Sequence, residues 1–173
     1  MSTSIAELRT AIDTLDQQLL QLLNQRATLA NAIGDIKRQE GSQVYRPERE
    51  AQVIHKLQTA NQGPLKADSV ANIWREVMSA CRALEEPHRV AYLGPEGTFS
   101  EQAAEAFFGV SIERVPCASF DEVFEATTSG RAAFGVVPME NSTEGVVTRS
   151  LDLFLTSPLH IIGEVSLLIR HNL

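Results

Sequence analysis

The sequence predicts two regions of different fold class: an all-α region of three helices over residues 1–87, and a partial α/β region with a parallel sheet over residues 88–173. Before Pro87, apolar residues recur at steps of three and four, which is the period of an amphipathic helix. After His88, short β-rich runs alternate with helical segments, a pattern typical of parallel sheets. We therefore place a domain boundary near Pro87 and His88.

The first predicted helix runs from Ser4 to about Lys37 and ends before Gly41. It opens on "SIAE", which matches a Ser-x-x-Glu capping box. At 1.5 Å per residue the helix is about 50 Å long, which a region of this size cannot cover. Its apolar side therefore needs a partner chain, and we expect a homodimer packed along it.

The other elements follow from the same kind of signal. Pro47 suits the first turn of a second helix that ends before "NQGP", and Asp68 is the expected N-cap of a third helix that runs to about Glu85. The third helix has an apolar face of Val70, Ile73, Trp74, Val77, Cys81 and Leu84. After the boundary we expect a strand at 89–94, a helix at 98–109, a strand at 112–117, a helix at 119–130, a strand at 132–139, a helix at 145–155 and a strand at 160–169. Ser119 and Glu122 form a second capping box.

Charge and cysteine content argue against several classes of function. The net charge is −7, with −1 in residues 1–87 and −6 in residues 88–173, which disfavours a nucleic-acid partner. Cys81 and Cys117 stand far apart in no metal-ligand spacing, which argues against a zinc site or a disulfide framework and suits a reducing cytoplasm. We see no run of about 18 apolar residues and no secretory leader, so we expect a cytoplasmic protein with no membrane partner.

One cation interrupts the apolar side of the first helix. The positions on that side are Ile5, Leu8, Ile12, Leu15, Leu19, Leu22, Arg26, Leu29, Ile33 and Ile36. Arg26 could be a polar residue that fixes the register of a coiled coil. However, Lys37 follows on the same face about 16 Å away, and a buried cation costs several kcal/mol unless it is paired. A dianionic small ligand would satisfy Arg26, Lys37 and Arg49 together, because a guanidinium binds a carboxylate through two parallel hydrogen bonds.

Three motifs of the helical region resemble the all-helical chorismate mutases: "LRTAIDTLDQQLLQLLNQRATLANAIGDIK", "VYRPERE" and "IWREVMSACRALE". The resemblance covers residues 4–86 and implies an intertwined dimer of three-helix chains whose active sites take residues from both chains. It also implies a Claisen rearrangement of chorismate to prephenate. That reaction is pericyclic, so no metal or other cofactor is expected, and catalysis consists of positioning and electrostatic preorganisation.

The resemblance also implies a catalytic role for particular residues. Arg26 and the partner's Arg9 hold carboxylates of the substrate, as does the neighbourhood of Arg49. Lys37 donates to a carboxylate and to the breaking ether oxygen, and Glu50 holds the substrate hydroxyl. These residue types suit a dicarboxylate that must be folded into a compact conformer while negative charge develops on its ether oxygen.

Three further positions differ from some relatives. Glu85 stands where some carry a glutamine that faces the ether oxygen. A glutamate can donate a hydrogen bond there only when it is protonated, so we expect either a mutase rate that rises toward acid pH or a Glu85 pKa raised by burial. Cys81 stands where some carry a serine, and it is either a substrate contact or a small buried core residue. Arg46 stands where some carry an aspartate, so we leave it out of the site.

Two loops of the second region, in "YLGPEGTFSEQAA" and "FGVVPMENSTEGVV", each follow a predicted strand. The Gly-Pro-x-Gly-Thr turn places backbone N–H groups at a helix N-terminus, where an anion can bind. Each loop alone is more often ordinary turn chemistry, but loops after successive parallel strands meet at one edge of the sheet and together favour a small-anion cleft. Both loops resemble prephenate dehydratases, which convert prephenate to phenylpyruvate. The resemblance implies a substrate site of Thr98, Ser100, Glu140, Asn141 and Ser142.

The order of the two regions resembles the bifunctional proteins of phenylalanine biosynthesis. The ending "GEVSLLIRHNL" resembles the middle of a dehydratase domain, so we expect an N-terminal portion of a longer protein, with mutase activity and little or no dehydratase activity. Two other functions remain open: a non-enzymatic dimeric sensor of small carboxylates, and a purely structural coiled coil. Arg26 and Lys37 argue against the sensor, and the loops of the second region argue against the coiled coil.

Overall fold

The computed structural model describes residues 4–40, 45–85, 88–142 and 145–169. The chain divides into two compact units, Met1–Tyr45 and Arg46–Leu173, and each is described by itself. Gly41, expected to follow the first helix, and Pro87, expected at the domain boundary, lie outside the described residues. No helix within the described ranges is long and apolar enough to cross a membrane.

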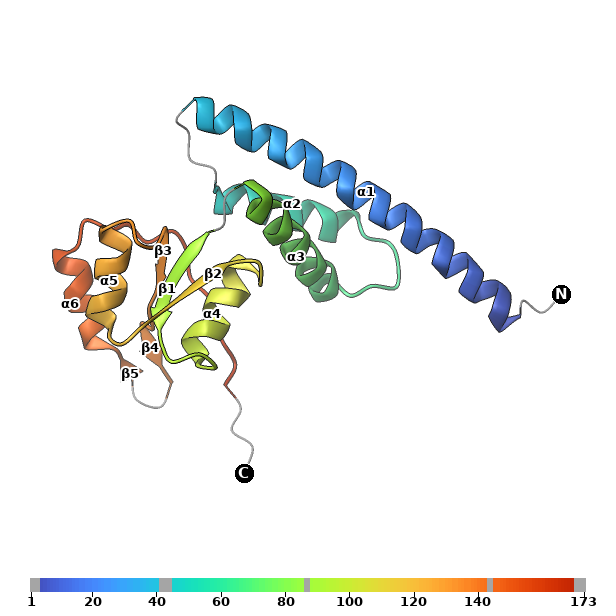
Figure 1. The fold of residues 1–173 in the computed structure, drawn as a ribbon. Helices are drawn as coiled ribbons and strands as arrows, with labels where there is room; N and C mark the ends of the chain where they lie inside the picture. The colour runs from blue at the N-terminus through green and yellow to red at the C-terminus, as the bar shows by residue number, and fades with distance from the viewer. Residues whose placement is uncertain (1–3, 41–44, 86–87, 143–144, 170–173) are drawn as a thin grey trace. The chain divides into compact units, whose positions relative to one another are not determined.

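The first unit consists of one long helix, α1 (Ile5–Gln39), drawn in blue in Figure 1. The predicted capping box is confirmed. Ser4 Oγ accepts a hydrogen bond from the Glu7 N–H at 3.2 Å, and Glu7 Oε2 accepts one from the Ser4 N–H at 2.7 Å. Lys37 and Arg38 lie in the last turn, where cations interact favourably with the helix dipole. The start of this helix therefore follows from local side-chain chemistry, and the charges of its last turn suit its C-terminus.

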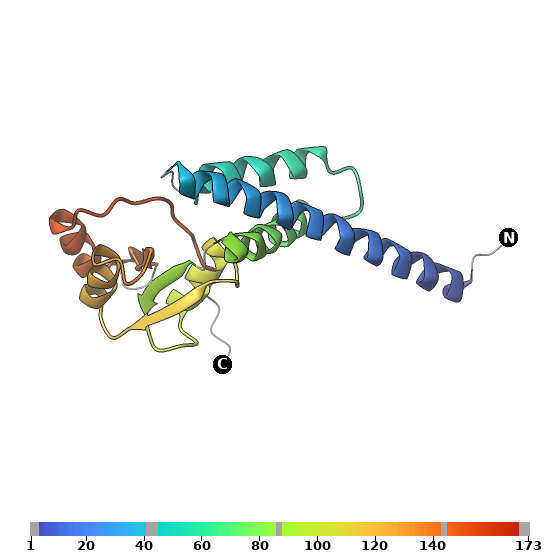
Figure 2. The ribbon, with the colours of Figure 1, turned by 45° about the horizontal axis from the view of Figure 1, so that its top comes forward.

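The second unit begins with an antiparallel hairpin of two helices, α2 (Pro47–Ala60) and α3 (Ala67–Glu85), visible in Figures 1 and 2. At the turn of the hairpin, Gln58 Nε2 donates to the carbonyl of the first α3 residue at 3.0 Å. At the other end, Glu50 Oε1 on α2 lies 3.1 Å from Arg82 Nη1 on α3. Polar contacts at both ends thus fix how the two helices run beside each other.

The details of the hairpin correct two sequence expectations. Pro47 occupies the first turn of α2 as predicted. Asp68 is not the N-cap of α3, because the helix already begins one residue earlier, and a carboxylate in the first turn also complements the helix dipole. The expected apolar face of α3 is partly wrong, since Ile73 and Leu84 are 44% and 64% exposed. The buried side chains of α3 are Val70, Met78, Ser79, Cys81 and Arg82.

The remainder of the second unit is built on a parallel sheet of β1 (Arg89–Leu93), β2 (Glu113–Cys117) and β3 (Phe134–Val136). The strand order is β2-β1-β3, and both pairs of neighbours are parallel, which confirms the predicted sheet. Helix α4 (Phe99–Phe108) connects β1 to β2, and α5 (Phe120–Thr128) connects β2 to β3. These two connections run in opposite directions along the sheet, so right-handed crossovers place the helices on opposite faces, as Figure 1 shows.

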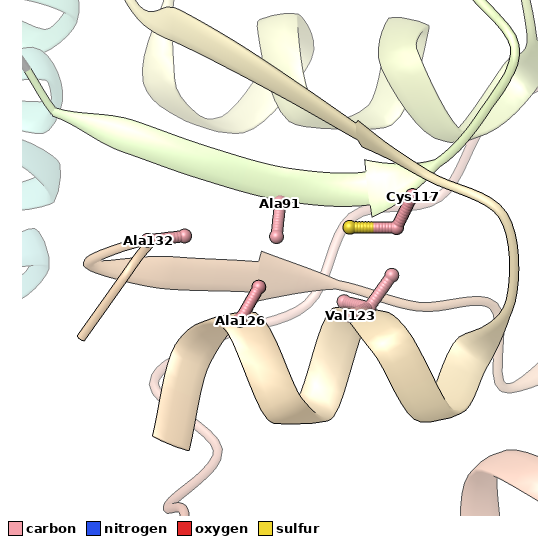
Figure 3. Close-up of a cluster of buried hydrophobic side chains, with 5 residues drawn as sticks. All are labelled: Ala91, Cys117, Val123, Ala126 and Ala132. Carbon is pink, nitrogen blue, oxygen red and sulfur yellow. The ribbon is translucent and has the colours of Figure 1, made fainter. Parts of the chain in front are cut away.

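The core between α5 and the sheet is made of small side chains. Figure 3 shows its five buried members: Ala91, Cys117, Val123, Ala126 and Ala132. Small residues let the helix backbone approach the sheet closely, and at Gly135 in β3 an added Cβ would lie 2.7 Å from Thr127 Oγ1. Burial also raises the pKa of the Cys117 thiol above its ordinary value. Cys117 therefore behaves as a packed core residue.

The N-terminus of α5 carries only part of the predicted second capping box. Ser119 Oγ accepts from the Glu122 N–H at 3.2 Å, as expected. The Glu122 carboxylate, however, accepts from the Ala118 N–H at 2.7 Å, one residue before the cap. That bond and an ion pair with Arg131 lower the pKa of Glu122. The cap therefore satisfies two backbone donors, although one of them is not the predicted partner.

Two short strands follow β3 where only a loop and a helix start were expected. β4 (Glu140–Asn141) and β5 (Gly145–Val146) form an antiparallel ladder, and the Val147 N–H donates to the Met139 carbonyl at 3.0 Å. Helix α6 (Thr148–Thr156) therefore begins three residues after Gly145, the predicted start. The ladder folds the segment between β3 and α6 back on itself, and the predicted helix is confirmed with a later beginning.

The strand predicted at residues 160–169 is wrong. Residues 157–169 form neither helix nor strand, and they run from α6 back to α4 as an irregular segment (Figure 2). At Gly163 an added Cβ would lie 2.6 Å from the ring of Phe107. An apolar run becomes a strand only where another strand supplies the ladder hydrogen bonds, and none of the described strands pairs with this segment.

Helix α3 packs closely against the turn that joins α4 to β2. Ser79 Oγ accepts from the Ser111 N–H at 3.2 Å, and Glu76 Oε2 accepts from the Val110 N–H at 3.2 Å. Gly109 immediately precedes these two donors and has φ of +82°, and an added Cβ would be 2.4 Å from the Cβ of Ser79. This position therefore requires glycine for two reasons, its backbone conformation and the lack of space.

We expect Gly109→Ala to lower the free energy of unfolding by about 3 kcal/mol. The backbone of Gly109 (φ +82°, ψ 176°) lies in a region essentially restricted to glycine, which costs alanine about 1 kcal/mol or more, and the clash with Ser79 adds about 2 kcal/mol. Gly130→Ala is the matched control, because Gly130 has φ of +77° and nothing within 4 Å of an added Cβ. Urea unfolding followed by circular dichroism and by the fluorescence of Trp74 would measure both variants. Equal losses would contradict the close packing of α3 on this turn.

Candidate active site

Helix α1 carries three of the predicted catalytic cations. Arg26 and Lys37 are separated by close to three full turns, so they share one face about 16 Å apart. Arg9 lies about 26 Å from Arg26 in the other direction, too far for one small ligand to contact both within a chain. The flanking Leu22 and Leu29 are 60% and 67% exposed in the single chain. The cations therefore lie among aliphatic side chains that are exposed in the single chain.

The α2–α3 hairpin positions the predicted Glu50. Its carboxylate lies in the first turn of α2, where the helix dipole favours negative charge. Glu50 Oε1 is 3.1 Å from Arg82 Nη1, and the exposed fractions of the two side chains are 18% and 8%. Arg82 Nη2 also donates to the carbonyl oxygen of Phe108, the last residue of α4. Glu50 is thus held by a guanidinium that is itself fixed from a second side.

The end of α3 carries two other predicted residues. Cys81 is buried, with 6% of its surface exposed, and Glu85 lies one helical turn further on and is half-buried. Arg49 precedes Glu50 on α2 and is exposed, as is Arg46 at the N-cap. The hairpin therefore brings Glu50 to the end of α3 that bears Cys81 and Glu85. The cations of α1 belong to the other unit, so their grouping with these residues stays a prediction.

Arg82 is a residue that sequence reasoning missed. It lies outside the predicted apolar face of α3, and nothing in the local pattern distinguishes it from a solvated cation. Its burial arises from contacts with Glu50, far back along the chain, and with Phe108 of the α/β region. No signal within the sequence of α3 itself could have found it.

The loop after β1 contains the predicted Thr98 and Ser100. Thr98 is the N-cap of α4, and its Oγ1 donates to the Leu93 carbonyl at 3.0 Å without capping the helix. Ser100 follows in the first turn of α4. The loop is closed by two further bonds: the Gly94 N–H donates to the Cys117 carbonyl at 2.8 Å, and the Gly97 N–H donates to Glu101 Oε2 at 2.5 Å. Backbone and side-chain bonds therefore fix the approach to the N-terminus of α4.

A cluster of charged side chains, Arg114 with Glu101 and Glu105, lies next to this loop. Arg114 Nε on β2 lies 3.0 Å from Glu101 Oε1, and Arg114 also pairs with Glu105, one turn later on α4. The hydrogen bond to Glu105 raises the pKa of Arg114 above its ordinary value. Burial, together with the carboxylates of Glu101 and Glu96, raises the pKa of the Tyr92 hydroxyl. Tyr92 therefore stays neutral, and Arg114 stays cationic, over the whole physiological range.

The second predicted loop follows β3. Glu140 and Asn141 form β4 and Ser142 lies in the turn after it, and all three are exposed. β1 and β3 are neighbouring parallel strands in which Tyr92 is opposite Val136, so the loops that follow them leave the same edge of the sheet. Among the described residues, no three His, Cys, Asp or Glu side chains are grouped so as to hold a metal ion. The remaining ligand-binding groups at this edge are carboxylate, amide, hydroxyl and backbone groups.

The two regions match two family models. Residues 8–86 match the chorismate mutase type II model, and residues 90–173 match the prephenate dehydratase model. A solved structure of a chorismate mutase from Thermus thermophilus is 30% identical, with a TM-score of 0.47, over 47% of this chain and 93% of that one.

Curated relatives combine both activities in their names. A bifunctional chorismate mutase/prephenate dehydratase from Neisseria gonorrhoeae is 49% identical over all of this chain and 48% of its own length. One from Aquifex aeolicus is 44% identical over 93% of this chain and 46% of its own length. The chain thus spans about half the length of these relatives. It belongs to the bifunctional chorismate mutase/prephenate dehydratase family, with its mutase region in residues 8–86 and its dehydratase region beginning at residue 90.

Proposed function

We propose that this chain catalyses the rearrangement of chorismate to prephenate. The observation that carries the proposal is the match of residues 8–86 to the chorismate mutase model, together with Arg26 and Lys37 on one face of an otherwise aliphatic helix side. The relatives of nearly half identity are named as enzymes, so the sensor alternative is not favoured. We also propose the cytoplasm as its location, in keeping with a small-molecule biosynthetic enzyme.

In the proposed mechanism the protein supplies position and charge. Arg26, with Arg49 and the partner's Arg9, binds the two carboxylates and selects the compact conformer in which the new carbon–carbon bond can form. Lys37 donates to a carboxylate and to the ether oxygen, and so stabilises the negative charge that develops as the carbon–oxygen bond breaks. The Glu50 carboxylate accepts a hydrogen bond from the substrate hydroxyl, and Glu85 faces the ether oxygen in its protonated form. Cys81 is a candidate neighbour of the substrate.

The proposed active unit is a homodimer. The aliphatic side of α1 is largely exposed in the single chain, for example 71% at Ile5, 56% at Leu15 and 67% at Leu29. A row of exposed aliphatic residues this long is more than a stable monomer leaves uncovered. A second, antiparallel copy of α1 would cover it and would bring the partner's Arg9 toward Arg26.

The α/β region is proposed to bind prephenate, the product of the first site. Thr98 and Ser100 at the N-terminus of α4 would meet a carboxylate with hydroxyl and N–H donors. Glu140, Asn141 and Ser142 would contact the remainder of the ligand from the neighbouring loop. The proposal for the whole protein is therefore two consecutive reactions on one chain, with prephenate as the shared compound.

We expect Arg26→Ala to lower kcat/KM for chorismate by about a hundredfold or more, because a charge-assisted donor to the substrate is lost. Arg38→Ala is the matched control. Arg38 is a cation on the same helix, but it pairs with Asp35 at the surface, so its loss should change kcat/KM by about twofold at most. The decrease in chorismate absorbance gives both values. If Arg26→Ala kept full activity while folded as a dimer, the role of Arg26 in the site would be wrong; a folded wild-type dimer that does not consume chorismate would contradict the mutase proposal itself.

Mixing two inactive variants tests whether both chains contribute to one site. Arg9→Ala and Arg26→Ala homodimers should each be inactive. In a mixed dimer, one of the two sites has both arginines intact, so an equal mixture after subunit exchange should recover about a quarter of wild-type activity. Chorismate consumption before and after exchange is the measurement. No recovery, with mixed dimers demonstrated by mass spectrometry, would mean that Arg9 and Arg26 do not come to one site from different chains.

The pH profile tests the role of Glu85. Since the proposed donor is the protonated carboxylic acid, log(kcat/KM) should rise as pH falls below neutrality, until the side chain is fully protonated. Glu85→Gln donates at every pH and should give a profile without that rise. Initial rates from mildly acidic to mildly alkaline pH, with circular dichroism to check folding, provide the comparison. Profiles of the same shape in the two proteins would remove Glu85 from the mechanism.

A further inference from the structure

The side chain of Arg82 joins elements from both regions of the second unit. Its Nη1 lies 3.1 Å from Glu50 Oε1 on α2, and its Nη2 donates to the Phe108 carbonyl at the end of α4. The arginine is only 7% exposed, so both contacts lie away from bulk water. One guanidinium therefore connects the mutase region to the dehydratase region.

The chemistry of the guanidinium makes this contact specific. The group is planar and its donors point in fixed directions: Nη2 donates a hydrogen bond to the Phe108 carbonyl, and Nη1 forms an ion pair with Glu50 at 3.1 Å. A charge buried to this degree is strongly unfavourable without such partners. Lysine would replace it only in part, because its ammonium is a compact point charge without the planar fork that spans partners on two elements.

The held carboxylate keeps the capacity to bind a ligand. A carboxylate has two oxygens and about four lone-pair directions, so an ion pair through Oε1 does not exhaust what Glu50 can accept. At the start of α2 and beside the end of α3, Glu50 is held by this ion pair, and the dipole of α2 favours its negative charge. A displacement of about 1 Å in such a group is enough to reduce activity substantially.

We propose that Arg82 is a positioning residue of the mutase site, which holds the Glu50 carboxylate in place for the substrate hydroxyl while it is anchored on the α/β region. The inference rests on the proposed function of Glu50. It goes further by making a main-chain carbonyl of the dehydratase region, at Phe108, part of the support of the mutase site. Glu76 and Ser79 bind the next residues of the same turn from the same face of α3, so the anchor is not an isolated contact.

The test uses steady-state kinetics of the full 173-residue chain. Arg82→Gln keeps an N–H donor for the Phe108 carbonyl but loses the charge that holds Glu50. We expect the KM for chorismate to rise by about tenfold to a hundredfold with a smaller change in kcat, because the hydroxyl contact is made in both the ground state and the transition state. The KM of Arg82→Lys for chorismate should lie between the values of the wild type and of Arg82→Gln. If Arg82→Gln does not fold, the lysine variant alone decides the matter through its KM.

Two further variants separate positioning from general stability. Ser79→Ala breaks another bond to the same turn without touching Glu50, so it should lower the melting temperature and leave KM within about twofold. In the Glu50→Gln variant, adding Arg82→Gln should raise the KM for chorismate by less than about twofold. The residue through which Arg82 acts has already been changed, so little further effect is expected.

Three outcomes would overturn the inference. An unchanged KM in a folded Arg82 variant, or losses that add fully in the double variant, would reduce Arg82 to a structural residue while the mutase proposal stands. A folded wild-type dimer without mutase activity would instead overturn the proposed function, and this inference with it.

Discussion

A buried guanidinium imposes the constraint on which the arrangement of the second unit depends. Arg82 is 7% exposed, and a charge removed from water to that extent requires fixed partners. Those partners come from α2 through Glu50 and from α4 through the Phe108 carbonyl. Because one side chain contacts both, these two contacts fix the position of the helical hairpin relative to the α/β region. The close contact of Gly109 with Ser79 follows, because the bonds from α3 draw the turn onto the helix.

The same need for a partner applies to the cations of the proposed mutase site, where the proposed partner is the substrate instead of another part of the protein. Arg26 and Lys37 interrupt a row of aliphatic residues, and a cation that is buried among aliphatic side chains must be paired. A dicarboxylate supplies that pairing, and the low dielectric that makes an isolated cation unfavourable makes a paired one bind more strongly. The aliphatic neighbours and the cations therefore act together. In the proposed homodimer a second copy covers α1, and this is why we connect catalysis to dimerisation.

The sequence predicted the elements whose signals are local. Ser4 and Glu7 lie three residues apart, and their capping box forms as expected, because both partners belong to the same helical turn. The parallel sheet was predictable from the alternation of strands and helices, and so was the meeting of the two loops at one of its edges. The strand expected at 160–169 failed for the converse reason. A strand needs a partner elsewhere in the chain, and an apolar run does not reveal whether one is present.

The buried face of α3 could not be predicted from the local sequence pattern alone. Periodicity chose Ile73 and Leu84 as inward residues, yet both are exposed, and the face that packs on the α/β region instead carries Ser79 and Arg82. Polar residues can be buried there because their partners are main-chain groups of the turn after α4, and backbone groups have no sequence signature. The glycine of that turn was visible in the sequence, but its role depends on a serine on another helix. An interface that binds main chain through a few polar side chains is thus the kind of feature that amphipathic patterns conceal, and in this protein it lies beside a proposed catalytic carboxylate.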